Sequence, residues 1–246
     1  MTRSRLDRYL VEHALVESGG KAQALIMAGE VMVNGQKALK PGQLVPSGAR
    51  VELLAKSRYV SRGGFKLEHG LTVFGISPQG LVCADFGTST GGFTDCLLQH
   101  GALRVHAIDT GSGQIDWRLR TDPRVVLHEN TNARFVEPGT LGETVDLAVC
   151  DVSFISSTLV VPAMARVLTA SGRILVLVKP QFEVPKGQVG PGGIVRDPVQ
   201  HAESCAKVER TLEELGFRTK LAESPITGTE GNKEFLMFGE KDVKAA

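Results

Sequence analysis

The segment from Leu81 to Thr94 constrains the fold more than any other part of the chain. A short apolar run ends at Asp85, a loop with three glycines follows, and an apolar helical pattern begins at Phe93. This order predicts a strand, a tight turn and a helix, the first unit of a nucleotide-binding α/β sheet. Glycines in such a turn let the backbone approach a ligand closely, and amide groups at the helix start face that ligand.

The glycine loop fits neither of the two best-known phosphate-binding patterns. The dinucleotide pattern G-x-G-x-x-G fails because Thr88 and Ser89 follow Gly87. The phosphate loop G-x-x-x-x-G-K-[ST] nearly fits, but Phe93 occupies the position of its lysine. A D-x-G-x-x-x-G-G loop without lysine suits a ligand with a ribose and a compact zwitterion, such as S-adenosylmethionine. A plain strand, turn and helix with glycines for turn geometry is the alternative that the loop alone leaves open.

Charge is distributed unevenly along the chain. Residues 1–66 hold 11 Lys and Arg against five Asp and Glu, a net charge of +6, whereas the remainder carries −5. A basic N-terminal segment followed by a mildly acidic remainder suggests a polyanion-binding module joined to a part with another function. A solvated basic face is the alternative.

Cysteine spacing and hydropathy disfavour several classes of protein. The four cysteines form no C-x-x-C pair, so zinc binding and thioredoxin chemistry are not expected. Cys83 and Cys150 lie in apolar strand patterns, as buried thiols of a reducing cytoplasm do. No signal peptide is visible, and the apolar run Ile174–Val178 is far shorter than the roughly 20 residues that span a bilayer. We therefore expect a cytoplasmic protein with no membrane or metal partner.

The first 56 residues predict a compact unit of two helices and a small sheet. Helical spacing begins at Leu6, and Ser18 is placed to cap a second helix. Strand patterns at Val31–Val33 and Val51–Leu53 follow, with Asn34-Gly35 as a type I′ hairpin signal.

This order resembles the alpha-L RNA-binding motif, known from a small-subunit ribosomal protein, pseudouridine synthases and a tyrosyl-tRNA synthetase. The resemblance rests on R-L-D-x-x-L, S-x-x-K-A, G-x-V-x-V-N-G and K-P-G. Members often carry Arg after the capping serine, but Gly19 and Gly20 follow it here, which removes a phosphate contact. The expected RNA-binding residues are Arg3, Arg5, Arg8, Lys21 and Arg62.

The rest of the chain alternates strand and helix patterns. Strands are predicted at 104–109, 125–127, 145–150, 174–178, 217–221 and 234–238. The carboxyl ends of parallel strands share one rim, where ligands bind. We expect four charged side chains on that rim: Asp85, Asp109, Asp151 and Lys179.

Six blocks in order resemble the TlyA family, whose members are known as haemolysins and as FtsJ/RrmJ-like ribosomal RNA 2′-O-methyltransferases. They are S-R-G-G-x-K-L (61–67), D-x-G-x-S-T-G-G-F-T (85–94), D-V-S-F-I-S (151–156), V-K-P-Q-F-E (178–183), G-P-G-G-I-V-R-D-P (190–198) and G-N-K-E-F (231–235). The resemblance implies a Rossmann-like methyltransferase sheet of seven strands, the last antiparallel, with helices on both faces. It also implies a small α+β RNA-binding domain at 1–56, a linker at 57–62 and a methyltransferase domain at 63–242.

The resemblance further implies a catalytic tetrad of Lys66, Asp151, Lys179 and Glu234. A ribose 2′-hydroxyl is a weak nucleophile and must lose its proton as it attacks a sulfonium methyl. A lysine serves as a base when desolvation or a neighbouring cation favours its neutral form. We expect Lys179 to be the base and Lys66 the neighbouring cation, with Asp151 orienting Lys179 and Glu234 positioning Lys66 or the ribose. The methyl is already activated, so no metal is required.

The cofactor expected from the resemblance is S-adenosylmethionine. The glycine loop would hold its methionine end, Asp109 its ribose hydroxyls and the segment from Glu129 its adenine. One departure is Ser112, where members commonly carry tyrosine. The expected cofactor residues are Asp85, Gly87, Ser89, Thr90, Gly91, Gly92, Phe93, Asp109, Glu129, Asn130 and Asp151.

The substrate implied is a cytidine ribose in ribosomal RNA, within one or both ribosomal subunits. The short tail after Phe238 favours the form that acts on the large subunit. Arg196 and His201 are placed in a Gly/Pro-rich insertion that follows Lys179, either a substrate-side loop around 185–198 or a plain surface loop. Oligomeric state is not fixed by the sequence, and a monomer is favoured. Two other functions stay open: a non-catalytic RNA-binding protein with a decayed methyltransferase body, and a membrane-active haemolysin.

Overall fold

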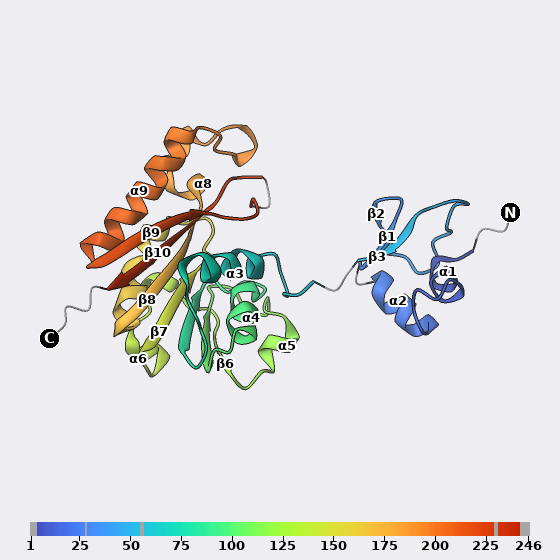
Figure 1. Cartoon of the computed structure of the whole chain (residues 1–246), viewed down its shortest axis with the longest axis horizontal. Coiled ribbons are helices and arrows are strands. Elements are labelled where there is room, and N and C mark those ends of the chain that lie inside the picture. Colours follow the sequence, from blue (N-terminus) through green and yellow to red (C-terminus); the bar gives the residue numbers. More distant parts are fainter. Residues whose placement is uncertain (1–3, 28, 55–56, 229–230, 242–246) are drawn as a thin grey trace. The chain divides into compact units, whose positions relative to one another are not determined.

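The computed structural model describes residues 4–27, 29–54, 57–228 and 231–241. Within this part the chain forms two compact units that divide between Arg58 and Tyr59 (Figure 1). Each unit has its own hydrophobic core, and the two are treated separately below.

The N-terminal unit packs two helices against a small antiparallel sheet. Its elements are α1 (Leu6–Glu12), α2 (Gly19–Met27), β1 (Val31–Val33), β2 (Gln36–Lys37) and β3 (Val51–Leu53), with strand order β2-β1-β3. Leu6, Leu10 and Ile26 are fully buried at its centre, as the helical spacing predicts.

Local signals in the sequence explain the turns of this unit. The hydroxyl of Ser18 accepts a hydrogen bond from the Lys21 backbone N–H at 3.3 Å, so the predicted helix cap is present. Asn34 and Gly35 both have positive φ, 51° and 79°, which is the geometry of the predicted type I′ hairpin turn.

The C-terminal unit is a seven-stranded sheet with helices on both faces. Its strands are β4 (Val82–Phe86), β5 (Arg104–Ile108), β6 (Val125–His128), β7 (Val145–Cys150), β8 (Leu168–Val178), β9 (Phe217–Glu223) and β10 (Phe235–Lys241). Their order is β6-β5-β4-β7-β8-β10-β9. β10 pairs antiparallel with both β8 and β9, and the other neighbouring pairs are parallel. This confirms the predicted Rossmann-like methyltransferase sheet with its last strand reversed.

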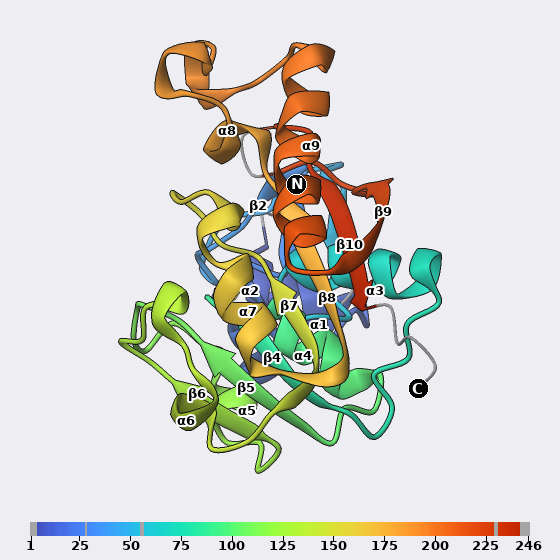
Figure 2. The same cartoon turned by 90° about the vertical axis from the view of Figure 1, so that its left-hand side faces the viewer.

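Two hydrophobic layers cover this sheet. One face packs against α3 (Gly63–Phe74), α4 (Gly92–Gln99) and α5 (Trp117–Arg120). The other packs against α6 (Pro138–Leu141), α7 (Val161–Val167) and α9 (Pro198–Glu214) (Figures 1 and 2). The short helix α8 (Pro180–Glu183) follows β8 directly, and four 3₁₀ turns lie in the loops: Ala133–Phe135, Ser157–Leu159, Lys186–Gln188 and Pro191–Gly193.

Several elements differ from the sequence-based expectation. β9 and β10 extend to Glu223 and Lys241 rather than to 221 and 238, and β10 begins at Phe235 rather than at Glu234. β8 begins at Leu168 rather than Ile174, because its first half includes polar and glycine residues that carry no continuous apolar pattern. His201 lies in α9 and not in the preceding loop. Asp197 caps that helix by accepting a hydrogen bond from Val199 N–H, and Pro198 occupies its first turn, so the helix starts before His201.

Candidate active site

A cavity of about 230 Å³ lies at the carboxyl ends of β4, β7 and β8. The glycine loop, the start of α3 and the beginning of β10 supply the other walls. All four residues of the predicted tetrad line it: Lys66, Asp151, Lys179 and Glu234. Asp151 follows β7 and Lys179 follows β8, as the strand pattern predicts.

Two ion pairs organise this cavity, one partly buried and one buried. The Nζ atom of Lys179 lies 2.6 Å from Asp151 Oδ1 and donates a hydrogen bond to Ser153 Oγ at 2.9 Å. Lys66 is paired with Glu234, and these two side chains are 9% and 3% exposed. Both lysines therefore have a carboxylate partner within one site.

The sheet topology brings these side chains together. β7 and β8 are adjacent and parallel, so the residues that follow them, Asp151 and Lys179, lie side by side. β10 is antiparallel to β8, with Phe235 opposite Val178. The residue before β10, Glu234, therefore reaches the same rim although it precedes its strand.

The predicted rim position of Asp85 is not what the structure shows. Asp85 lies within β4, is fully buried, and its Oδ2 accepts hydrogen bonds from Thr94 N at 3.0 Å and Thr94 Oγ1 at 2.7 Å. Burial raises the pKa of Asp85 to about 7, partly offset by the Thr94 hydroxyl. The side chain points to the start of α4, so it fixes the glycine loop against that helix.

Two glycines of the loop are required by close contacts. A Cβ atom on Gly87 would lie 2.8 Å from the carbonyl oxygen of Asp151, and the φ of Gly87 is +88°. A Cβ atom on Gly92 would lie 2.2 Å from Ser61 Oγ. Bare backbone at these points lets the loop lie directly against the Asp151 segment and the start of α3.

A second cavity, of about 480 Å³, adjoins the first: Gly87, Ser89 and Asp151 line both. Asp109 lines the second cavity and a small pocket beside it. The carboxylate of Asp109 accepts hydrogen bonds from Ser89 N and Gly111 N, both at 2.7 Å. Each oxygen keeps a lone pair for a further donor. This arrangement matches the predicted acid after the second strand of the fold.

The remaining predicted cofactor residues fall into two groups. Ser89, Thr90, Gly92 and Phe93 line the 230 Å³ cavity. Gly91 instead occupies the N-cap of α4 with a φ of 97°.

Two predicted cofactor residues lie on the loop after β6. The Glu129 carboxylate accepts a hydrogen bond from Gly113 N at 2.6 Å and pairs with Arg120, whose hydrogen bond lowers the pKa of Glu129. Glu129 lines a small pocket with Asp109. Asn130 is exposed with a φ of 55°.

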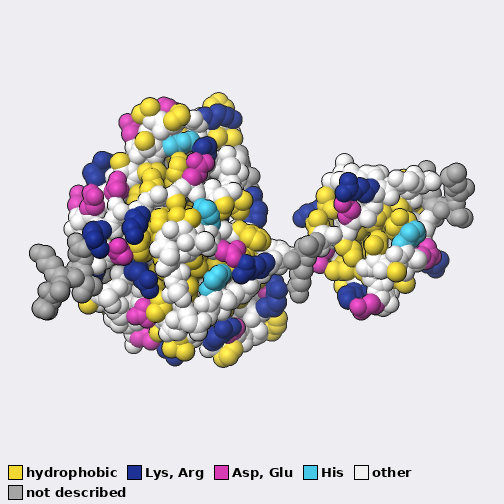
Figure 3. All heavy atoms as spheres, viewed as in Figure 1, with side chains coloured by type: hydrophobic (Ala, Val, Ile, Leu, Met, Phe, Trp, Pro, Cys, Tyr) yellow, Lys and Arg dark blue, Asp and Glu magenta, His cyan; other side chains and the backbone are white. Residues whose placement is uncertain are grey.

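The predicted RNA-binding residues are divided between the units. Arg5, Arg8 and Lys21 are exposed on the N-terminal unit, where Arg5 pairs with Asp7 at 2.7 Å. Arg62 lines the 230 Å³ cavity of the C-terminal unit. The face of the N-terminal unit seen in Figure 3 has hydrophobic side chains at its centre with charged ones around them. Arg3 lies outside the described residues.

Sequence reasoning missed two residues beside the tetrad. No sequence motif identifies Ser153 as a site residue, yet its hydroxyl accepts a hydrogen bond from Lys179. Phe154 is 92% exposed with a φ of 65°. The centre of its ring lies 5.3 Å from that of Phe182, and both residues line a cavity of about 320 Å³. Both belong to the D-V-S-F-I-S block, so the block was a signal, although nothing local separates them from its other members.

Two structural features bear on metal binding and on membrane insertion. In the part of the chain that the structure describes, no three His, Cys, Asp or Glu side chains are grouped as metal ligands. Among the same residues, no helix combines the length and the apolar character needed to cross a bilayer. All four cysteines are buried, and burial raises the pKa of the Cys150 thiol to about 12.

Comparison with protein families matches both units. Residues 59–241 match the FtsJ-like methyltransferase family, and residues 4–51 match the S4 domain. The match to the methyltransferase family covers most of the chain.

Individual relatives extend over nearly the whole chain. The 16S/23S rRNA (cytidine-2′-O)-methyltransferase TlyA of Mycobacterium tuberculosis is 45% identical over 96% of this chain and 89% of its own length. The 23S rRNA (cytidine-2′-O)-methyltransferase TlyA of Campylobacter jejuni is 34% identical over 94% of this chain and 97% of its own. A solved structure of a hemolysin-named protein from Streptococcus thermophilus is 42% identical, covers 98% of this chain and 89% of that one, and has a TM-score of 0.75.

Proposed function

The chain belongs to the TlyA family of FtsJ-like methyltransferases, and from that premise we propose that it methylates the ribose 2′-hydroxyl of a cytidine in ribosomal RNA, with S-adenosylmethionine as methyl donor. The observation that carries the proposal is the convergence of Lys66, Asp151, Lys179 and Glu234 on one cavity beside the glycine loop. Relatives that carry this activity in their names align with both units.

The polar groups of the rim fit S-adenosylmethionine. Asp109 offers carboxylate oxygens for ribose hydroxyls, and Asp151 places negative charge at the glycine loop, where a cationic group is favoured. Gly87 leaves its backbone open to a ligand at a point where a Cβ atom would take up the space. When bound, this cofactor supplies a methyl group activated by a positively charged sulfur. The residues that would hold it are Gly87, Ser89, Thr90, Gly92, Phe93, Asp109 and Asp151, with Glu129 and Asn130 toward the base and Asp85 and Gly91 supporting the loop.

Lys179 is the proposed general base. In its neutral form it takes the proton of the 2′-hydroxyl, and the ammonium that results is held by Asp151 at 2.6 Å and Ser153 at 2.9 Å. The paired Lys66 and Glu234 line the same cavity and would orient the ribose. In-line alignment by this rigid frame supplies much of the acceleration, for which effective molarities of about 10⁵ M or more are attainable.

The N-terminal unit is proposed to hold the ribosomal RNA. Its match to the S4 domain and its exposed Arg5, Arg8 and Lys21 support contacts with the phosphate backbone. Arg62, at the edge of the active-site cavity, is placed to meet a phosphate next to the target ribose. Such contacts favour an RNA substrate without specifying its sequence.

Methyl transfer to separated ribosomal subunits tests the proposal. Tritiated S-adenosylmethionine is incubated with each subunit, and the blocked ribose is then mapped. We expect labelled cytidine 2′-O-methyl groups with the wild-type protein, none with Lys179→Ala, and RNA binding retained by both. Lys220→Ala, which changes an exposed lysine of β9, is the matched control and should keep full activity.

Transfer, RNA-binding and liposome assays together distinguish this function from the two alternatives. Transfer that is unchanged in Lys179→Ala would contradict the mechanism. RNA binding with no transfer by the wild-type protein would favour the non-catalytic RNA-binding function. Leakage of liposomes by the pure protein would favour the haemolysin.

A further inference from the structure

Glu183 is a buried charged residue that the proposed mechanism leaves unused. It ends α8, the short helix that follows Lys179, and its side chain is only 1% exposed. A buried carboxylate is costly unless it is paired and hydrogen-bonded, so its partners show what the fold uses it for.

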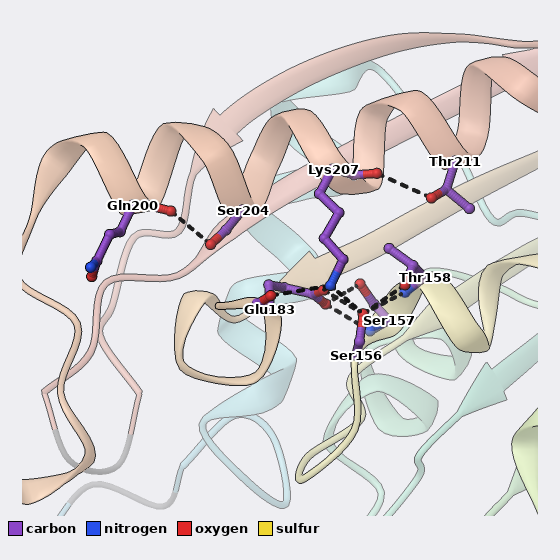
Figure 4. Close-up of polar contacts among 8 residues, drawn as sticks. All are labelled: Ser156, Ser157, Thr158, Glu183, Gln200, Ser204, Lys207 and Thr211. Atoms are coloured by element: carbon purple, nitrogen blue, oxygen red, sulfur yellow. Dashed lines mark hydrogen bonds and ion pairs between the residues drawn. The ribbon is translucent and has the colours of Figure 1, made fainter. Parts of the chain in front are cut away.

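The partners of Glu183 come from two other elements (Figure 4). Oε1 accepts hydrogen bonds from the backbone N–H and the hydroxyl of Ser157, both at 2.7 Å, and Oε2 accepts one from the hydroxyl of Ser156. Lys207 of α9 lies 3.2 Å from Oε2 and also donates to the Glu183 carbonyl oxygen at 3.1 Å. The charge is therefore satisfied on every side by donors.

These contacts join the same two segments that meet in the active site. The segment 151–157 follows β7 and begins with Asp151. The segment 179–183 follows β8 and begins with Lys179. Lys179 ties the two segments at Asp151 and Ser153, and Glu183 ties them again at Ser156 and Ser157. The segment that carries Ser153 is thus held at both ends.

We propose that Glu183, held by Lys207, is a positioning residue for methyl transfer. It fixes the 152–157 segment against α8 and thereby keeps Ser153 and Asp151 at hydrogen-bonding distance from Lys179. This inference rests on the proposed function, because it gives Lys179 the role of base.

The chemistry requires a carboxylate at this position. A glutamine could still accept the two hydrogen bonds from Ser157 through its oxygen. Its amide NH₂ would then face the Lys207 ammonium, so two donors would oppose each other at 3.2 Å. Glu183→Gln therefore loosens the outer half of the contact while it preserves shape and volume.

The first test needs no substrate. Amide hydrogen exchange of residues 152–157 is compared in the full-length wild type and in Glu183→Gln. We expect at least tenfold faster exchange in the variant, and unchanged exchange would overturn the proposal. Glu209→Gln is the matched control: Glu209 is a partly buried glutamate of α9 that accepts a hydrogen bond from Thr219, and its substitution should leave residues 152–157 unchanged. This arm stands even if the proposed methyl transfer is wrong.

The second test is kinetic. Glu183→Gln is expected to lower kcat by about tenfold to a hundredfold, with little change in KM for the RNA, and to move the acidic limb of the kcat–pH profile to lower pH. The double variant Glu183→Gln/Ser153→Ala should lose less than the product of the two single effects. A lower Tm with unchanged kcat and pH profile would mean a merely structural role and would overturn the proposal.

Lys207→Met provides a second route if Glu183→Gln fails to fold. It removes the counter-charge but keeps the serine donors, and we expect the same direction of change in exchange and in kcat. If Lys179→Ala abolishes transfer while both Glu183→Gln and Lys207→Met transfer at the wild-type rate, the proposed function stands and this inference falls.

Discussion

Lys66 and Glu234 form a buried ion pair although 168 residues separate them in the chain. Lys66 comes from α3 on one face of the sheet, and Glu234 immediately precedes β10. The pair therefore joins the first helix of the C-terminal unit to its last strand at the mouth of the active site. A buried pair of this kind contributes position more than stability, but losing one partner leaves an uncompensated charge.

Glu234→Ala is expected to lower the free energy of unfolding by about 3–5 kcal/mol, because it leaves the Lys66 ammonium buried without a counterion. Methyl transfer should fall with it. The double variant Lys66→Met/Glu234→Ala should regain part of the stability and none of the activity. Urea unfolding and methyl transfer measure the two effects. Glu240→Ala, at a half-buried glutamate that pairs with Arg218, is the control and should change stability by about 1 kcal/mol or less. A double variant with wild-type activity would refute the proposed tetrad.

Asp85→Asn is expected to change how stability depends on pH. The folded pKa of Asp85, about 7, lies above its ordinary value of 3.8, so the folded state binds a proton that the unfolded state releases. Stability from this group is complete below pH 3.8 and is lost as pH rises toward 7, by up to about 4 kcal/mol. Asp85→Asn removes this loss, so the free energy of unfolding of the variant, measured in urea, should rise relative to that of the wild type between pH 4 and 7. A constant difference across that range would show that Asp85 does not titrate there.

Gly87→Ala is expected to abolish methyl transfer. The added Cβ would lie 2.8 Å from the Asp151 carbonyl oxygen, and a non-glycine residue at φ +88° costs about 1–2 kcal/mol in addition. Gly113→Ala is the matched control, since Gly113 also has a positive φ of 70° but nothing lies within 4 Å of its added Cβ. Both variants should lose stability in thermal unfolding, whereas Gly87→Ala alone should lose activity. Equal activity of the two would show that the contact with Asp151 is unimportant.

Asp109→Ala is expected to weaken cofactor binding by roughly tenfold to a hundredfold, the loss of about 1.5–3 kcal/mol from hydrogen bonds to a charged group. It also removes the acceptor for Ser89 N and Gly111 N, so the loop would lose its anchor. Isothermal titration calorimetry with S-adenosylmethionine measures the change. Asp122→Ala removes a carboxylate whose partner is Arg124, and this control should bind as the wild type does. Normal affinity of Asp109→Ala would remove this residue from the proposed cofactor site.

The sequence predicts most of the fold because its signals are local. Apolar runs mark β4, β5, β6 and β7, and the hairpin at Asn34-Gly35 follows from two residues that tolerate positive φ. The rim positions of Asp109, Asp151 and Lys179 follow from strand ends in a parallel sheet. The reversed direction of β10 came from the family resemblance and not from any spacing.

Contacts between distant segments could not be predicted in this way. The partner of Lys66 and the contact of Ser153 with Lys179 depend on which strands become neighbours. Asp85 was predicted to follow the end of its strand, but it lies within β4, because the apolar pattern does not show that the strand continues through Phe86. Glu183 gave no local signal, because a glutamate in a short helix is usually exposed.

The reversed last strand also sets the order in which the site is completed during synthesis. Lys66, Asp151 and Lys179 are all translated before β10, but Glu234 reaches them only when β10 inserts between β8 and β9. A chain that lacks β10 therefore carries three of the four proposed groups, and the fourth comes with the strand that lies between β8 and β9. The proposed tetrad is thus complete only when the last strand is in place, so a chain truncated before β10 is expected to be inactive in methyl transfer.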